Sequence, residues 1–176
     1  MIEDFNDYTR NDFLNVLNNR KHKYIEPLDM PLSILKTGTE RIVSGTVIGG
    51  NLSLLVTSLG TPYEIDTEGK IIFLEDVSEE IGRIDRMLTH LEYAGKFDKC
   101  KGIIFGNFDD CRNRYDEKYT FYSLIEDFFK NYCKPVFYNF ESGHAKPFLA
   151  TVPLGSKCTM DTEKKEIIFE KMEVLG

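Results

Sequence analysis

Apolar residues along this chain recur with two different periods, and from residue 41 onward the two periods alternate. Short apolar runs typical of buried strands occur at residues 42–48, 70–74, 102–106 and 136–138. Stretches with helical spacing of apolar residues lie between them, at residues 51–59, 78–94 and 120–132. This order predicts an α/β domain with a largely parallel sheet flanked by helices.

The ends of these elements carry recognisable capping and breaking residues. Gly49-Gly50 is expected to end the first strand, and Asn51 is expected to cap the helix after it. Ser78 is expected to cap the next helix, which has Glu79 and Glu80 in its first turn. Residues 157–170 predict two more short strands around a turn, which would form a small β-rich appendix.

The first 41 residues differ in character from the rest. Thr9 can cap a helix whose apolar face would consist of Phe13, Leu14 and Leu17. The basic residues 19–23 follow this helix and suit its C-terminus. Residues 24–41 lack periodicity and predict a linker or an extended edge. We therefore expect residues 1–41 to form a helix and linker from a domain junction, and residues 42–176 to form the main domain.

Composition and charge narrow the possible functions. The chain has 176 residues, of which 41% are hydrophobic and 29% charged, as in an ordinary soluble globular protein. A net charge of −7 argues against nucleic-acid binding, and the apolar runs are too short to span a membrane. Residues 1–10 do not resemble a signal peptide, and the four cysteines have no metal-ligand spacing. These features favour a cytoplasmic protein with free thiols.

Candidate chemistry lies where two predicted strands end. Glu75 directly follows the apolar run 70–74, and Ser142-Gly143-His144 follows the strand near residue 136. In open α/β sheets ligands bind beyond the carboxyl ends of the strands. A buried carboxylate requires a partner, and a carboxylate next to an imidazole fixes the histidine tautomer. A strand-end glutamate or a loop histidine also has ordinary structural roles, so spacing alone leaves the pairing of Glu75 with His144 open.

Other sites have weaker support. Gly49-Gly50 matches neither dinucleotide-binding nor phosphate-loop motifs, so a tight backbone turn explains it better. The acidic set Glu75, Asp76, Glu79 and Glu80 offers oxygen ligands for Mg²⁺, although helix capping explains its last two members. No GxSxG nucleophile motif occurs, and Ser53 and Ser142 are poorly placed candidates. We therefore expect no metal, no cofactor and no nucleophile within the chain.

Several distinctive motifs follow one another in a fixed order along the chain. They are the segments 49–55, 59–63, 69–77 (Gly-Lys-Ile-Ile-Phe-Leu-Glu-Asp-Val), 83–88 (Arg-Ile-Asp-Arg-Met-Leu), 102–106, 143–144 (Gly-His) and 153–155 (Pro-Leu-Gly). Together they closely resemble the serine LD-carboxypeptidases, the muramoyltetrapeptide carboxypeptidases of bacterial cell-wall recycling. The resemblance covers roughly residues 42–161. It extends to a sister group, the peptidases that confer immunity to microcin C, although the wording of 74–77 and 83–88 favours the cell-wall group.

The resemblance implies a two-domain hydrolase of which this chain is the C-terminal half. It implies that Glu75 orients His144, the general base, and that an amino-terminal domain supplies the serine nucleophile of a Ser-Glu-His triad. Asn51 and Asp76 are candidates for substrate binding. The implied partners are that amino-terminal domain, a murein tetrapeptide and a second copy in a homodimer. Where relatives have Pro-Tyr this chain has Ile81-Gly82, which would alter the pocket wall.

Overall fold

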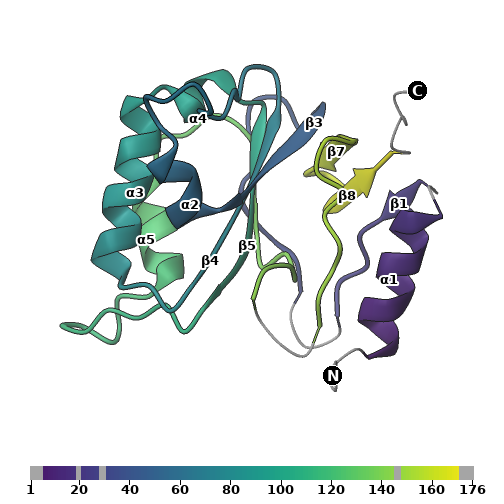
Figure 1. Cartoon of the computed structure of the whole chain (residues 1–176), viewed down its shortest axis with the longest axis horizontal. Coiled ribbons are helices and arrows are strands. Elements are labelled where there is room, and N and C mark those ends of the chain that lie inside the picture. Colours follow the sequence, from purple (N-terminus) through teal and green to yellow (C-terminus); the bar gives the residue numbers. More distant parts are fainter. Residues whose placement is uncertain (1–5, 19–20, 28–30, 145–147, 171–176) are drawn as a thin grey trace.

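The computed structural model describes residues 6–18, 21–27, 31–144 and 148–170. Within these residues eight strands form one mixed, curled sheet with the order β1-β8-β7-β3-β4-β5-β6-β2 (Figure 1). The strands are β1 (His22–Lys23), β2 (Ser33–Lys36), β3 (Ile42–Asn51), β4 (Ile71–Val77), β5 (Gly102–Asp109), β6 (Val136–Tyr138), β7 (Lys157–Asp161) and β8 (Glu166–Phe169). The helices are α1 (Asp7–Leu17), α2 (Leu52–Thr57), α3 (Ile81–Tyr93), α4 (Lys96–Lys99) and α5 (Phe121–Phe128).

The centre of the sheet is parallel and its two flanks are antiparallel. Strands β3, β4, β5 and β6 run parallel, with a helix in each connection between consecutive strands. Strand β2 pairs antiparallel with β6, so the segment expected to be a linker or edge supplies an edge strand. The predicted β-rich appendix continues the same sheet, because β7 pairs with β3 and β8 pairs with β7. The α/β class is confirmed.

Two hydrophobic cores lie on opposite faces of the central strands. One core fills the space between the sheet and helices α2, α3, α4 and α5, which lie on the same side (Figure 1). Ile72 and Leu74 of β4 belong to this core, whereas Ile71 and Phe73 belong to the second core, which β7 and β8 help to enclose. The alternation follows from the two-residue period of a strand. Strand β4 is therefore buried on both faces, as its continuous apolar run predicts.

Gly49 and Gly50 do not break the first strand, contrary to the sequence prediction. Strand β3 continues through both glycines to Asn51, which caps α2 as expected by accepting a hydrogen bond from Leu54 N (3.1 Å). Both glycines have positive φ angles, +128° and +142°. A Cβ on Gly49 would overlap the carbonyl oxygen of Phe73, so the glycine permits the close approach of β4.

The predicted cap at Ser78 is also wrong. Helix α3 begins at Ile81 with Glu80 as its N-cap, and Ser78 has a φ angle of +57°. The backbone of residues 78–80 pairs instead with the segment that follows β5. Arg112 N donates to Glu79 O (3.1 Å), and Ser78 N donates to Asp109 O (2.9 Å). These tertiary hydrogen bonds delay the start of the helix beyond the point that local capping residues indicate.

Helix α1 buries the opposite face from the one that the sequence predicts. Its N-cap is Asn6, and Thr9 lies inside the helix. The apolar residues Phe13, Leu14 and Leu17 are 41%, 40% and 62% exposed, whereas the polar residues Thr9 and Asp12 are buried. The helix therefore packs on the domain through a polar face.

The basic segment after α1 does not extend the helix. Asn19 and Arg20 lie outside the described residues, and His22 and Lys23 form strand β1, which pairs with β8. None of the described helices is both long and apolar enough to traverse a bilayer. All four cysteines, Cys100, Cys111, Cys133 and Cys158, are free.

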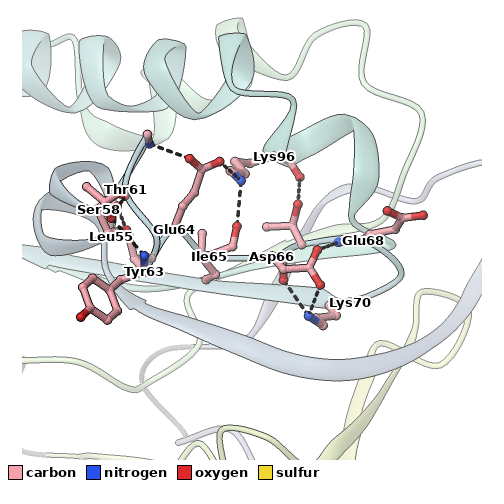
Figure 2. A network of polar contacts seen from close by, with 12 residues as sticks. Leu55, Ser58, Thr61, Tyr63, Glu64, Ile65, Asp66, Glu68, Lys70 and Lys96 are labelled. Atoms are coloured by element: carbon pink, nitrogen blue, oxygen red, sulfur yellow. Dashed lines mark hydrogen bonds and ion pairs between the residues drawn. The ribbon is translucent and has the colours of Figure 1, made fainter.

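A polar network holds the loop that leads into β4 (Figure 2). The buried Lys96 pairs with Glu64 and donates to Ile65 O (2.8 Å), while Lys70 pairs with Asp66 at 2.7 Å. The hydrogen bond from Lys96, together with one from Gly60 N, lowers the pKa of Glu64, and the Lys70 ammonium lowers the pKa of Asp66. This network fixes the amino end of the strand that carries Glu75.

Candidate active site

Glu75 and His144 meet at the carboxyl edge of the parallel sheet. Glu75 lies on β4, which continues three residues beyond the predicted end at Leu74. Its carboxylate Oε2 lies 2.7 Å from Nδ1 of His144, although 69 residues separate them along the chain. The Glu75 side chain is 8% exposed and the His144 side chain 55% exposed. The pair therefore combines a sheltered carboxylate with an imidazole that faces outward.

The strand alternation explains why Glu75 faces His144 while its neighbour does not. Glu75 follows Phe73 on the face of the second core, and Asp76 follows Leu74 on the helical face. The register between β4 and β5 shifts between Leu74 and Asp76, which is a bulge at the level of Glu75. The extra residue lies on β5, because Leu74 pairs with Phe105 and Asp76 with Phe108, so β4 keeps its alternation and Glu75 stays on the face of the second core. Bulges are frequent next to active sites.

The loop that carries His144 approaches Glu75 through a glycine. Gly143 has a φ angle of +137°, which residues with a side chain rarely adopt. A Cβ at this position would lie 2.9 Å from Oε2 of Glu75. The preceding residue is tied to the sheet, since Asn107 N donates to Ser142 O (2.9 Å). Gly143 therefore lets the loop pass close enough for the imidazole to reach the carboxylate.

Asn51 and Asp76, the two candidates for substrate binding, bond to each other. Asn51 Nδ2 donates to Asp76 Oδ1 (3.1 Å), and Asn51 Oδ1 caps helix α2. Asp76 Oδ2 accepts from both the backbone N–H (3.0 Å) and the hydroxyl (2.8 Å) of Ser53. These contacts position the start of α2 beside Glu75. A role of Asn51 and Asp76 in substrate binding stays a prediction.

The structure does not bring a serine hydroxyl to the imidazole within the described residues. Ser53 lies on the helical face, where its hydroxyl bonds Asp76. Ser142 is buried, and no hydrogen bond joins it to the ring of His144. The acidic set around Glu75 also divides between two faces of the sheet. In the described part of the chain no group of three or more histidine, cysteine or acidic side chains is arranged to hold a metal ion.

Sequence reasoning missed the buried polar residues around the His144 loop. Glu141 is 4% exposed, and its Oε2 accepts from Asn107 at 3.4 Å, while Oε1 has no hydrogen-bond partner among the described residues. Burial raises the pKa of Glu141, and the bond from Asn107 partly opposes that shift. Asp12 and His22 form a second carboxylate–imidazole pair, which unlike the first is buried on both sides, with Oδ1 and Nε2 2.5 Å apart. No spacing or motif in the sequence marks these contacts, because each joins segments that only the fold brings together.

The geometry of the site describes an α/β domain that carries a carboxylate–histidine pair, and comparison with known families agrees with this description. The domain presents the pair at the carboxyl edge of its sheet, and among the residues that the structure describes no serine hydroxyl is bonded to the ring. A family model described as the LD-carboxypeptidase C-terminal domain matches residues 44–160. The chain therefore belongs to the LD-carboxypeptidase family, and the resemblance seen in the sequence is confirmed.

Individual relatives extend the match beyond the family segment. The chain is 36% identical over 170 residues to a probable murein peptide carboxypeptidase of Bacillus subtilis, covering 96% of this chain and 52% of that protein. It is 34% identical over 128 residues to the microcin C7 self-immunity protein MccF of Escherichia coli, covering 71% of this chain and 36% of that protein. The chain thus spans about half the length of the Bacillus subtilis protein.

Solved structures show the same fold. A crystal structure of muramoyltetrapeptide carboxypeptidase from Oxalobacter formigenes superposes with a TM-score of 0.78 at 26% identity, over 98% of this chain and 60% of that one. Wild-type MccF gives a TM-score of 0.79 at 25% identity, over 94% of this chain and 56% of that one.

Proposed function

We propose that this chain is the C-terminal half of a serine-type LD-carboxypeptidase. On this proposal residues 42–176 supply Glu75 and His144, residues 1–41 come from the domain junction, and an amino-terminal domain outside the chain supplies the serine. The substrate would be an L,D-linked murein tetrapeptide, from which the enzyme removes the terminal D-alanine during cell-wall recycling in the cytoplasm. The observation that supports this most is the 2.7 Å contact between Glu75 Oε2 and His144 Nδ1.

The proposed reaction is a metal-free acyl transfer. When Nδ1–H of His144 donates to Glu75, the basic lone pair lies on Nε2, the nitrogen that would take a proton from the serine hydroxyl. The serine oxygen then attacks the amide carbon before D-alanine, and His144 returns the proton to the leaving amine. The resulting acyl-enzyme is hydrolysed by water, with His144 again acting as the base. Glu75 holds the ring and stabilises the imidazolium throughout.

The proposal is tested by restoring the missing half of the site. D-alanine release from a murein tetrapeptide is measured for the chain alone, and for the chain mixed with a separately produced amino-terminal domain of the same family. We expect activity only in the mixture. Glu75→Gln should then lower kcat by roughly 10²–10⁴-fold, because the glutamine does not stabilise the imidazolium.

A matched control separates catalysis from folding. Glu79→Gln changes a nearby, mostly buried carboxylate on the segment before α3, where it pairs with the exposed Arg83 (3.3 Å) and lies near the hydroxyl of Ser53 on the helical face of the sheet. Because this face is opposite to that of His144, the variant should leave kcat within about twofold of wild type. The melting temperatures of both variants should stay close to that of the wild type. A Glu75→Gln mixture that turns over at the wild-type rate would remove Glu75 from the proposed triad.

A second candidate is a peptidase that confers immunity to microcin C. The similarity to MccF supports it, and one structure of MccF is a complex with aspartyl sulfamoyl adenosine. The reconstituted mixture should be offered a murein tetrapeptide and this aminoacyl nucleoside at equal concentrations. Faster cleavage of the nucleoside would favour the immunity function. Binding of the tetrapeptide without cleavage of either compound, in a mixture shown to form the two-domain complex, would favour a non-catalytic peptide-binding module.

A further inference from the structure

The amino-terminal helix packs against the segment that follows His144, and it does so with hydrogen bonds. Thr9 and Asp12 lie three residues apart on one face of α1, and they are 7% and 5% exposed. Thr9 Oγ1 accepts a hydrogen bond from Leu149 N (3.1 Å), and Asp12 Oδ2 accepts one from Thr151 N (2.6 Å). The ring of Tyr8 also meets the edge of Phe148. Three side chains of α1 thus hold consecutive parts of the chain downstream of His144.

Asp12 also contacts a buried histidine, in addition to the backbone of Thr151. Its second oxygen, Oδ1, lies 2.5 Å from Nε2 of His22, which is buried on strand β1. His22 pairs with Phe169 of β8, so the imidazole is attached to the curled flank of the sheet. The Asp12 carboxylate therefore links the sheet flank to the backbone at Thr151. Because it is almost completely buried, this link is sensitive to the loss of either partner.

The His144 loop is anchored separately at its two limbs. On the upstream side Phe140 N donates to Phe105 O (3.2 Å) and Asn107 N donates to Ser142 O (2.9 Å), both on β5. At the base of the loop Ala150 N donates to Glu141 O (2.5 Å). The downstream side rests on α1. The His144 side chain is 55% exposed, and among the described residues its ring is bonded to Glu75.

We propose that Thr9, Asp12 and His22 are positioning residues for His144. Together they form a clamp that fixes the downstream limb of the loop and so holds the imidazole at Glu75. The catalytic meaning of this clamp rests on the function proposed above, whereas its effect on the ring is independent of any reaction. Residues 1–41 are then part of the machinery that orders the site.

Polar docking makes such a clamp specific. Leu14 and Leu17 of α1 are 40% and 62% exposed, whereas Thr9 and Asp12 are buried and hydrogen-bonded to the domain, so the polar contacts set how the helix sits. Hydrogen bonds to a buried carboxylate are short and directional, and they set a single register between the helix and residues 149–151. A shift of α1 by one residue would leave the carboxylate of Asp12 buried without its donors.

The clamp is tested on the full chain labelled with ¹⁵N. Asp12→Asn leaves one side-chain oxygen for two donors, and Thr9→Val keeps the shape of the side chain but removes the acceptor. We expect amide hydrogen exchange to accelerate by at least about tenfold at Thr151 in Asp12→Asn and severalfold at Leu149 in Thr9→Val. Long-range ¹H–¹⁵N spectra should also show that less of the His144 ring is in the Nδ1–H form in both variants.

Two further variants separate positioning from general loss of stability. Thr67→Val removes an equally buried threonine hydroxyl that bonds Lys96 O (2.8 Å) at the opposite end of β4, and it should leave the His144 spectrum unchanged. Thr9→Ser retains the acceptor and should restore wild-type exchange at Leu149. Faster exchange with an unaltered His144 spectrum would show that the contacts are merely structural and would overturn the proposal. Unchanged exchange in Asp12→Asn would overturn it as well.

The spectra and the activity assay can fail independently. In the reconstituted mixture Asp12→Asn should lower kcat by about tenfold and leave KM within twofold, because the ring is misplaced while the rest of the site is intact. Should the mixture prove inactive with every substrate while the spectra change as expected, the hydrolase function fails and the clamp stands. If the mixture is active, but kcat and the His144 spectrum are unchanged by Asp12→Asn, the clamp is refuted and the hydrolase function is not.

Discussion

Replacing Gly143 by alanine should displace His144 from Glu75 and destabilise the fold. The φ angle of +137° at this residue costs about 1–3 kcal/mol for a residue with a Cβ. The new Cβ would also lie 2.9 Å from Glu75 Oε2, the oxygen that bonds the imidazole. If the carboxylate moves away, the bond to His144 weakens, and a bond of that kind contributes about 1.5–3 kcal/mol when sheltered. Because His144 is largely exposed, we expect the lower end of this range.

Gly50→Ala provides the matched control for Gly143→Ala. Gly50 has almost the same φ angle, +142°, and no atom lies within 4 Å of the position that its Cβ would occupy. It should therefore show the backbone cost of about 1–3 kcal/mol without the contact to the carboxylate. Urea unfolding measures both losses, and we expect Gly143→Ala to exceed Gly50→Ala by about 1–2 kcal/mol.

The ring of His144 provides the second reading. Long-range ¹H–¹⁵N spectra should show an altered Nδ1 environment in Gly143→Ala and a wild-type ring in Gly50→Ala. Equal losses of unfolding free energy in the two variants, together with an unchanged His144 spectrum, would refute the idea that Gly143 exists to let the loop approach Glu75.

Two further variants test the buried interior. Glu141→Gln should become more stable relative to the wild type as the pH rises, because burial raises the pKa of Glu141. In the wild type, the stability linked to protonated Glu141 is present below the ordinary glutamate pKa and is lost as the pH rises through the raised pKa. The glutamine of the variant does not titrate, so it does not lose this stability. Chemical unfolding at pH 4 and pH 7 checks this, and a constant difference between the two pH values would contradict it. Phe105→Ala should lower the free energy of unfolding by about 3–5 kcal/mol, because this fully buried ring packs on Phe108, Phe121 and Phe129, and a loss below 1 kcal/mol in urea would contradict it.

Patterns that depend on local periodicity predicted the central fold well. The apolar run of β4, the strand at Val136–Tyr138 and the start of α5 all lie where the sequence places them, although α5 ends at Phe128, before the predicted end at residue 132. These elements bury apolar residues on faces set by their own period, so a short window of sequence contains the necessary information. The same reasoning placed Glu75 and His144 at strand ends, where the parallel sheet brings them together.

Predictions failed where distant backbone or polar contacts decide the structure. The cap at Ser78 and the break at Gly49-Gly50 are plausible locally, yet pairing with residues 109–112 and the close approach of β4 override both. Helix α1 shows the largest difference, since its apolar residues suggested the buried face. The partners of Asp12 lie on segments 10 and 139 residues away in sequence, and no local signal indicates such a contact.

The network at the amino end of β4 has a consequence for specificity in folding. Neighbouring residues of a strand point to opposite sides, so a slip of one position would exchange the places of Glu75 and Asp76 and turn the wrong carboxylate toward the imidazole. The buried Lys96 of α4 pairs with Glu64 and donates to Ile65 O, so it ties the segment before the strand to a helix and opposes such a slip from the other end of the strand. An ion pair remote from the active site can thus fix the register that determines which of two adjacent acids reaches the histidine.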